Sequence, residues 1–318
     1  MMKARFLSAL LVGAMTVLPM TGALAQTVDK SVLMVLWKGE TGAEKAFKTK
    51  LAELGINATY KEVNADQDRA KLASELRAIE GDIAKKSYDA VYTYGTVGTQ
   101  VALGVVREQS PVIFNIVFDA VGGKLVKSKD QPGVPVTGVT NGVPIAAQFD
   151  AFTKLKPIKK LLVLFNAREP NSNIIEKEVA GWAEKNGVTM VSRRVTPDND
   201  SLKEVLAEVA SGKLQVDAAY AGADNYLASV AKEVHAAIGS KVALYGGTQT
   251  YIWGGWLGAY TPQVSDMGIA AAEQMAKVLK GADPATLPVV LPQPKLFVSK
   301  TAAAVHGITA PADAVMEN

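Results

Sequence analysis

The sequence predicts an α/β fold made of two doubly wound, Rossmann-like lobes with a ligand cleft between them. After the first 25 residues, strand-like apolar runs alternate with segments of helical spacing along the chain, which is the pattern of βα units. The same order of elements starts again near residue 142. About 290 residues follow the N-terminal leader, which is more than one compact core usually holds, so we expect two domains.

The first 25 residues are predicted to be a cleavable signal peptide. Lys3 and Arg5 precede an apolar stretch over residues 6–18, and a small-residue cleavage pattern stands before Gln26. The apolar stretch is shorter than the roughly 20 residues that a membrane-spanning helix needs. The chain has no cysteine, which excludes a lipid anchor on a cysteine, disulfides and thiolate chemistry. We therefore expect a periplasmic protein that begins near Gln26.

The N-terminal lobe is expected over residues 26–141. Its predicted strands are residues 31–37, 58–63, 90–94 and 111–118. Helices are expected over residues 43–54, over 66–84 and in the apolar segment that ends at 106. Each strand is followed by a helix, which is the order of a doubly wound sheet.

The C-terminal lobe is expected over residues 142–260. Its predicted strands are residues 159–165, 188–195, 216–220 and 242–246, and its predicted helices are residues 144–155, 173–185, 201–210 and 226–238. A further amphipathic helix over 262–279 and an extended, proline-broken segment over 287–298 indicate crossings between the lobes. Residues 261–291 are thus expected to return to the first lobe and 292–318 to the second, with a hinge near Asn141, Tyr260 and Pro292.

The junction between the strand at 90–94 and the next helix is a candidate anion-binding site. Gly95 and Gly98 let the backbone approach a ligand, and the hydroxyls of Thr96 and Thr99 can cap the helix or contact that ligand. The N-terminus of a helix offers unpaired N–H groups and a partial positive charge. The alternative is an ordinary strand-to-helix turn, because such turns contain similar residues throughout α/β proteins.

Few residues of this chain are suited to catalysis. His235 and His306 are the only histidines, and the metalloprotease, phosphate-loop and dinucleotide motifs are absent from the sequence. We therefore expect a binding protein without catalytic residues, cofactor or metal. The enzyme alternative is an exported hydrolase that uses Asp119 and Asp224 as paired carboxylates, one of them with a raised pKa.

The charge balance gives no support for nucleic-acid binding. The full chain has 34 Lys and Arg residues against 31 Asp and Glu residues, and removing Lys3 and Arg5 with the signal peptide leaves 32 against 31. A nearly neutral chain without basic clusters lacks the electrostatic footprint of a nucleic-acid-binding protein, so we expect no such partner.

Several aromatic residues fall at or near predicted loops. Trp37 and Phe118 end strands that face the proposed cleft, and aromatic faces favour rings and cations. Trp253 and Trp256 are expected in the core or at the interface between the lobes, because most large aromatic side chains serve burial. Lys38 and Glu40 could contact the ligand, but the preferred interpretation is a solvated pair on a loop.

The sequence resembles one family of ABC-transporter substrate-binding proteins, the group that includes tryptophan and tyrosine binders. The resemblance spans nearly the whole mature chain. It is carried by residues 111–126 (PVIFNIVFDAVGGKLV), 131–139, 157–173 (PIKKLLVLFNAREPNSN), 218–230 (AAYAGADNYLASV), 254–259 and 279–281, and by the closing Ala304, Gly307 and Pro311. It implies the type I periplasmic binding protein fold, with two lobes, three crossing segments and closure around a small solute.

In the first lobe, the resemblance implies two groups of ligand contacts. The loop at Tyr94, Gly95, Thr96 and Val97 would hold an anionic group on the helix N-terminus, and Asp119 would take a cationic group. This sequence departs from the family pattern nearby. Ala120 replaces a usual proline, Phe118 replaces a small polar residue, and the loop after Trp37 lacks the His-Pro often found there.

In the second lobe, the resemblance implies a loop that closes over the ligand. Asn166, Asn171 and Ser172 match this loop, and the pair Asp224 and Asn225 is suited to an ammonium group. Thr248 follows the next strand as a hydrogen-bond donor.

The function implied is solute capture without chemistry. We expect a monomer that binds a small-molecule solute, an amino acid or related zwitterion with an aromatic or large aliphatic side chain, and delivers it to an ABC-transporter permease in the inner membrane. A sensor that presents its ligand to a membrane receptor is the alternative, and the sequence does not separate these two partners.

Overall fold

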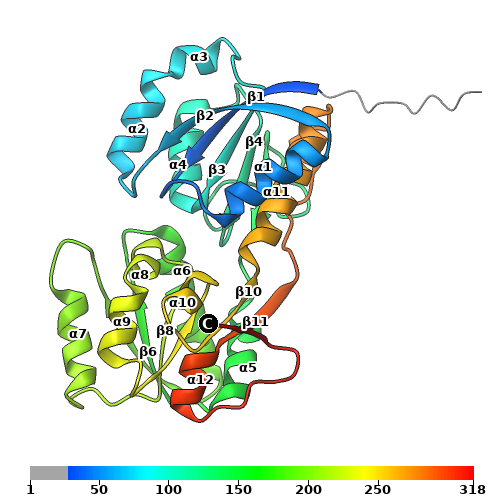
Figure 1. Ribbon diagram of the computed structural model, residues 1–318. Coiled ribbons are helices and arrows are strands. Elements are labelled where there is room, and N and C mark those ends of the chain that lie inside the picture. Colours follow the sequence, from blue (N-terminus) through cyan, green and yellow to red (C-terminus); the bar gives the residue numbers. More distant parts are fainter. Residues whose placement is uncertain (1–27) are drawn as a thin grey trace, which may run out of the picture.

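The computed structural model describes residues 28–318, in which two β-sheets are each covered by helices on both faces (Figure 1). The α/β fold with two lobes is confirmed. The predicted signal peptide over residues 1–25 lies outside the described residues. Among residues 28–318, no helix is long and apolar enough to cross a membrane.

The sheet of the first lobe has five parallel strands in the order β2-β1-β3-β4-β5. Its strands are β1 (Val28–Leu36), β2 (Ile56–Asn64), β3 (Ala90–Tyr94), β4 (Val112–Val117) and β5 (Val136–Thr140). Every residue of β3 and β5 is buried, as expected where helices cover both faces of a parallel sheet. These strands therefore read as continuous apolar or small-residue runs rather than as alternating patterns.

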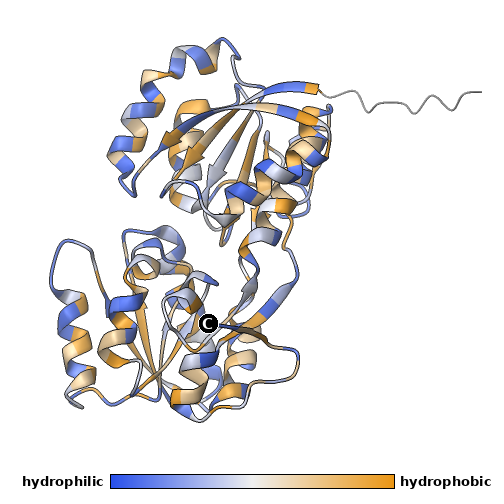
Figure 2. Cartoon of the chain, viewed as in Figure 1, coloured by the Kyte–Doolittle hydropathy of each residue, from blue (hydrophilic) through white to orange (hydrophobic). Residues whose placement is uncertain are grey.

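Helices from distant parts of the chain cover this first sheet. One face packs against α1 (Gly42–Glu53) and α11 (Val264–Leu279), and the other against α2 (Arg69–Ala78), α3 (Glu80–Ala84) and α4 (Gly95–Val106). Phe47 and Met267 are fully or almost fully buried on the first of these faces. Figure 2 shows the same division, with apolar strands inside and hydrophilic residues on the outer sides of the helices.

The sheet of the second lobe has seven strands in the order β12-β11-β10-β9-β8-β6-β7. Its strands are β6 (Lys160–Phe165), β7 (Thr189–Arg194), β8 (Ala218–Ala221), β9 (Ala243–Gly246), β10 (Gly258–Pro262), β11 (Pro294–Ser299) and β12 (Val315–Glu317). Only the pair of β10 and β11 is antiparallel among the described strands.

Helices also cover both faces of the second sheet. They are α5 (Ile145–Leu155), α6 (Pro170–Lys185) and α12 (Lys300–His306) on one face, and α7 (Ser201–Ala210), α8 (Asn225–Ser229), α9 (Ala231–Ile238) and α10 (Thr250–Trp253) toward the other. Phe149 stacks on Trp182 at a centroid distance of 4.1 Å, which joins α5 to α6 within the core.

The chain passes between the two sheets three times. It leaves β5 for α5, returns from β10 to α11, and crosses again after the short 3-10 helix Pro284–Thr286 to enter β11. The crossings run side by side along one edge of the molecule in Figure 1, and an isolated parallel bridge joins Val139 to Val290 there. The lobe boundaries and hinge positions expected from the sequence stay predictions.

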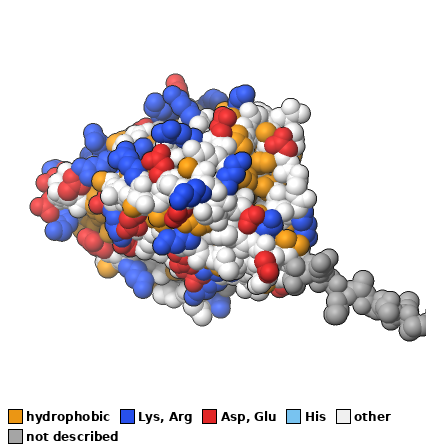
Figure 3. Space-filling model, turned by 90° about the horizontal axis from the view of Figure 1, so that it is seen from above, with side chains coloured by type: hydrophobic (Ala, Val, Ile, Leu, Met, Phe, Trp, Pro, Cys, Tyr) orange, Lys and Arg blue, Asp and Glu red, His pale blue; other side chains and the backbone are white. Residues whose placement is uncertain are grey.

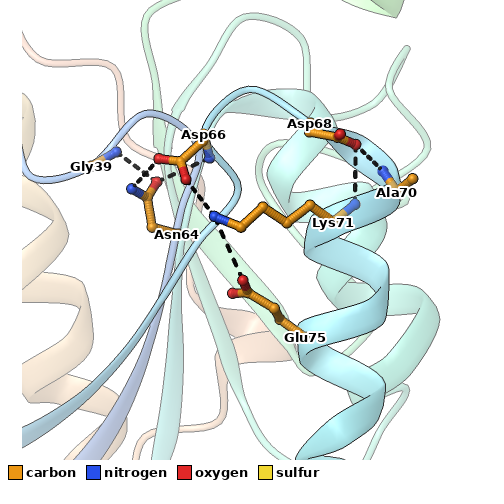
Figure 4. A network of polar contacts seen from close by, with 7 residues as sticks. All are labelled: Gly39, Asn64, Asp66, Asp68, Ala70, Lys71 and Glu75. Atoms are coloured by element: carbon orange, nitrogen blue, oxygen red, sulfur yellow. Dashed lines mark hydrogen bonds and ion pairs between the residues drawn. The ribbon is translucent and has the colours of Figure 1, made fainter.

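The helix expected over residues 66–84 is wrong in its extent. The structure has two shorter helices there, α2 and α3, and the first of them begins at Arg69. Asp66 and Gln67 take positive φ values of 50° and 64°, and Asp68 then caps α2 by accepting hydrogen bonds from the backbone N–H groups of Ala70 and Lys71. Figure 4 shows the polar network around this loop, in which Lys71 joins Asp66 to Glu75. Two consecutive left-handed residues cannot continue a right-handed helix.

The extended segment expected at 287–298 enters the second sheet as β11 from Pro294. Three other local expectations are wrong. The segment 226–238 is divided at Val230 into α8 and α9. The helices expected after the junction at 95–99 and over 173–185 both begin earlier, α4 at Gly95 and α6 at Pro170. Pro170 occupies the first turn of α6, where its missing N–H costs no hydrogen bond.

Trp253 is not a core residue, whereas Trp256 is. Half of the Trp253 side chain is exposed, and its Nε1 donates a hydrogen bond to Glu317. Trp256 is fully buried, with its Nε1 donating to the carbonyl of Ala231 at 2.9 Å.

The face of the first lobe seen in Figure 3 carries cationic and anionic side chains interspersed with apolar ones.

Candidate functional site: the cleft between the lobes

Two neighbouring cavities lie between the carboxyl ends of the two sheets. The inner one is narrow, with a volume of about 40 Å³, and the outer one has a volume of about 640 Å³. Both draw residues from loops that follow strands of the first and of the second lobe, as expected for ligand sites of parallel sheets.

The cleft brings together eleven of the thirteen predicted site residues. Those that line the inner cavity are Tyr94, Gly95, Thr96, Phe118, Asn171, Asp224, Asn225 and Thr248. Those that line the outer cavity are Trp37, Val97 and Asn166. Asp119 and Ser172 line neither cavity.

The first lobe contributes the N-terminus of α4 to the inner cavity. Gly95 takes a positive φ of 69°, so the chain turns directly from β3 into the helix without a loop. The first N–H groups of α4 have no partner within the helix, and they carry its partial positive charge. Thr96 lines the cavity, whereas the hydroxyl of Thr99 donates to the carbonyl of Gly95 within the helix.

Lys38 adds a full positive charge to this side of the cavity. It lines the inner cavity, and its Nζ lies 5.5 Å from the centroid of the Tyr94 ring. The electrostatic interaction with Tyr94 raises the pKa of the Lys38 ammonium despite its burial, so the group is charged at neutral pH. The expected solvated pair of Lys38 and Glu40 is wrong, because Glu40 pairs with Lys48 at 2.8 Å.

A bulge in β4 directs Phe118 into the inner cavity. The register between β4 and β5 shifts between Phe114 and Val117, and Ile116 takes a positive φ of 57°. A β-branched residue in this conformation is strained, and strain of this kind is found at ligand sites. Both Ile116 and Phe118 line the cavity, so the bulge shapes its apolar wall.

The second lobe contributes the buried carboxylate of Asp224. This residue is 2% exposed and caps α8 by accepting the N–H of Leu227 at 2.9 Å. The backbone N–H of Asn166 and the hydroxyl of Ser172 donate to its other oxygen at 2.9 and 2.5 Å. Ser172 thus positions Asp224 rather than lining the cavity itself.

Glu169 is a second buried carboxylate beside Asp224 and was not among the predicted site residues. It lines the outer cavity, is 5% exposed, and accepts hydrogen bonds from the backbone and the side-chain amide of Asn225. Burial and then the charge of Asp224 raise the pKa of Glu169 to about 7. Its one signal in the sequence was its position four residues after Phe165, the end of a strand, in the same loop as Asn166.

Two amide side chains at the inner cavity have polar atoms without hydrogen-bond partners among the described residues. Asn141 is 1% exposed, and neither its Oδ1 nor its Nδ2 has a partner among the described residues. Asn171 donates its Nδ2 to the carbonyl of Ala223, but its Oδ1 is also unpaired within the described part of the chain. Buried polar atoms without partners are costly, which favours a bound solute or water beside them.

Asp119 lies away from both cavities. Its carboxylate accepts the N–H of Val121 at 3.0 Å, which stabilises the turn after β4. Its charge, after burial, contributes to a raised pKa of Glu178 on α6. The structure therefore does not place Asp119 where it would contact a cationic group in the cleft, nor beside Asp224 as the hydrolase alternative requires.

The outer cavity has aromatic and cationic walls. Trp37 and Val97 line it from the first lobe, and Tyr226 and Pro197 from the second. Arg168 also lines it, with its guanidinium paired to Asp198 at 2.7 Å. Gln67, Asp68 and Arg69 also line it, and Asp68 is drawn in Figure 4.

Comparison with known proteins identifies the family. The model of the ABC transporter substrate binding protein family matches residues 31–317. The chain belongs to this family, whose members bind small ligands.

Among residues 28–318, no group of three or more His, Asp or Glu side chains is arranged to hold a metal ion.

Individual relatives of this ABC transporter substrate-binding protein are moderately similar to it. A curated tyrosine-binding protein of Clostridioides difficile is 26% identical over 79% of this chain and 71% of its own length. A Streptococcus pneumonia ABC domain in complex with L-Trp is 28% identical, with a TM-score of 0.76, and covers 90% of this chain and 99% of its own. A conserved domain protein of Vibrio cholerae shares the fold, with 24% identity, a TM-score of 0.80, and coverage of 92% and 100%.

Proposed function

We propose that this protein is the solute-binding component of an ABC importer, which captures an α-amino acid or related zwitterion between its lobes and delivers it to an inner-membrane permease. The observation that carries the proposal is the opposite polarity of the two sides of the cleft. The first lobe presents Lys38 and the N-terminus of α4, and the second presents the carboxylates of Asp224 and Glu169.

The two sides of the cleft match the two charged groups of an amino acid. Lys38 and the N-terminus of α4 form a positive pole, and Asp224 and Glu169 form a negative pole. An α-carboxylate would lie against the N–H groups at Gly95 and Thr96 with Lys38 beside them, because a helix N-terminus favours an anion. The α-ammonium would lie against Asp224 and Glu169, with the unpaired Oδ1 atoms of Asn141 and Asn171 as further acceptors. Closure of the lobes brings both sets of groups onto one solute, and the closed state is then favoured by these differential contacts.

An aromatic side chain is the preferred third group of the solute. The inner cavity is narrow, whereas the outer cavity offers space beside Trp37 and Tyr226, whose faces suit a planar ring. The relatives named above support this choice, because one is a tyrosine-binding protein and another was solved in complex with L-Trp.

The proposal includes the organisation expected from the sequence. Residues 1–25 would direct export to the periplasm and be removed. The first lobe would comprise residues 26–141 with the return at 261–291, and the second would comprise 142–260 with the return at 292–318. The protein would act as a monomer, and the three crossings near Asn141, Tyr260 and Pro292 would serve as the hinge.

Thermal unfolding tests this proposal. The protein is purified from Gln26 onward, washed under denaturing conditions to remove carried-over solute, refolded and heated with amino acids, sugars, polyols or nucleosides. A solute present at a hundred times its dissociation constant stabilises the protein by about 2.7 kcal/mol and raises Tm by about 5 °C or more. We expect this shift with L-tryptophan, L-tyrosine or another large amino acid.

Matched variants locate the site. Asp224→Asn should abolish the shift, whereas Asp313→Asn, at an exposed position near the C-terminus, should keep it. A panel in which only sugars or polyols raise Tm would contradict the amino-acid proposal, and an amino-acid shift that survives Asp224→Asn would contradict the site.

A further inference from the structure

Two buried carboxylates lie side by side in the cleft without a cation in contact. Glu169 and Asp224 are 5% and 2% exposed. Within residues 28–318, no nitrogen of Lys, Arg or His lies within ion-pair distance of either carboxylate, although twelve such pairs occur elsewhere in this part of the chain. Buried charges are ordinarily paired, so this cluster lacks one positive charge.

Neutral donors surround both carboxylates. Glu169 accepts from the N–H groups of Asn225 and Tyr226 at 3.0 and 3.3 Å, and from the amide Nδ2 atoms of Asn225 and Asn171 at 2.9 and 3.3 Å. Asp224 accepts from Leu227, Asn166 and Ser172. These dipoles stabilise a negative charge but do not neutralise a second one beside it.

The charged and titratable groups that face Glu169 leave it without a counterion. Lys38, on the opposite side of the cleft, interacts with Glu169 only over a distance. Arg168, its chain neighbour, is paired with Asp198. The phenols of Tyr94 and Tyr251 are neutral, because burial raises the pKa of each above its ordinary value.

We propose that Glu169 holds a proton when the cleft is empty and exchanges it for the protonated amine of the solute. This inference rests on the proposed function and adds a selection rule to it. A solute with a protonated amine supplies the positive charge that the carboxylate pair lacks, whereas a solute without one leaves Glu169 protonated. The cleft therefore selects amines, and capture is linked to proton release.

The exchange is balanced in charge and protons. In the empty cleft below pH 7, Glu169 is a neutral carboxylic acid beside the carboxyl group of Asp224. When R–NH₃⁺ binds, the carboxyl proton leaves to solvent and the amine keeps all three of its protons. The amine occupies the site as a cation, so the site has exchanged one positive charge for another. The shift of the Glu169 pKa to about 7 puts this exchange in the neutral range.

The sign of the pH effect follows from this balance. Below pH 7 the amine must displace a proton, so its affinity rises with pH until Glu169 is ionised in the empty protein. With a midpoint near 7, the affinity should increase about tenfold from pH 6 to pH 8, and binding should release close to one proton at pH 6. A solute without the amine should bind better at pH 6 than at pH 8.

Isothermal titration calorimetry measures the released proton. L-tryptophan is titrated into the protein at pH 6 in buffers of different ionisation enthalpy, and 3-indolepropionate, which lacks the amine, serves as the matched solute. We expect proton release and a tenfold pH effect with L-tryptophan, and the opposite pH effect without release with 3-indolepropionate. L-tryptophan binding with no proton release and equal affinity at pH 6 and pH 8 would overturn the proposal.

Two glutamate variants, one at the N-cap of α6 and one within that helix, test whether the pH effect belongs to Glu169 or to any acidic side chain nearby. Glu169→Gln should bind L-tryptophan at least tenfold more weakly at pH 8 and with no pH dependence. Glu184→Gln, at an exposed position of α6, should behave as the unchanged protein. A pH effect that persists in Glu169→Gln would assign the proton to another group and overturn the proposal.

A titration without solute keeps this test independent of the proposed function. The side-chain carboxyl carbon of Glu169, assigned by its loss in Glu169→Gln, is followed by NMR from pH 4 to pH 9 in the empty protein. A midpoint near 7 supports the proposal, and a midpoint below 5.5 overturns it whichever solute binds. If the midpoint is near 7 and no amine binds, the proposed function fails and the selection rule falls with it.

Discussion

Asn141 shows how a single residue can belong to the hinge region and to the site at once. It follows β5, where the chain leaves the first sheet, and it lines the inner cavity with both amide atoms unpaired among the described residues. Because its amide makes no hydrogen bond that removal would break, its polar atoms are free to contact a solute. Sequence alone placed Asn141 near the hinge but gave no reason to place it among the ligand contacts.

Asn141→Ala is therefore expected to weaken binding without loss of stability. The loss of one or two hydrogen bonds to the solute should cost about 1–2 kcal/mol, or roughly 5- to 30-fold in affinity. The free energy of unfolding without solute should stay within about 0.5 kcal/mol. Calorimetric titration and urea unfolding measure the two quantities.

Asn57→Ala, at an exposed position of β2, is the control and should leave the affinity unchanged. Equal affinity of Asn141→Ala and the unchanged protein would remove Asn141 from the binding site.

Lys38 and Glu169 mark the limit of residue-level prediction. Trp37 and Tyr94 could be placed at the cleft because each lies at the end of a predicted buried strand, whereas Asp224 was placed there through the family resemblance. Lys38 and Glu169 lie in loops that follow such strands, but a charged residue in a loop is usually solvated, and nothing local distinguishes these two. Only the folded chain brings Lys38 beside Tyr94 and Glu169 beside Asp224.

At the scale of elements, the contact between α1 and α11 decides how the second half of the chain returns to the first lobe. A Cβ added at Gly268 would lie 2.1 Å from the carbonyl oxygen of Ala43. The two helices thus approach so closely that only glycine fits at this position. The amphipathic pattern of α11 was evident in the sequence, but a local pattern does not say which sheet a helix covers.

Gly268→Ala should destabilise the protein, because the added methyl group has to push α11 away from α1. We expect a loss of about 1–3 kcal/mol in the free energy of unfolding, which exceeds the helix-propensity gain of about 1 kcal/mol. Chemical denaturation followed by circular dichroism measures this change.

Gly104→Ala is the matched control, since Gly104 lies in α4 with no atom within 4 Å of an added Cβ. It should be neutral or stabilising by up to about 1 kcal/mol. A stable Gly268→Ala variant would show that the two helices can separate at little cost.

At the scale of the whole molecule, the two lobes supply opposite halves of one binding site. Two sheets of mostly parallel strands face each other with their carboxyl ends (Figure 1). Both cavities are lined by residues that follow these ends. The repeated element order and the length of the chain were sufficient to predict this architecture. The division of charge between the lobes was predicted only in part, because Asp119 was expected to contact a cationic group in the cleft but lines neither cavity.

The central claim is that one solute is held by a positive pole from one lobe and a negative pole from the other. Calorimetry with truncated solutes tests this claim most directly. The amino acid that gives the largest thermal shift is compared with its analogue without the carboxylate and its analogue without the amine. Removing either charged group should weaken binding at least tenfold, because charge-assisted hydrogen bonds contribute about 1.5–3 kcal/mol each. An analogue that binds as tightly as the intact amino acid would contradict the account, because one of the two poles would then have no partner.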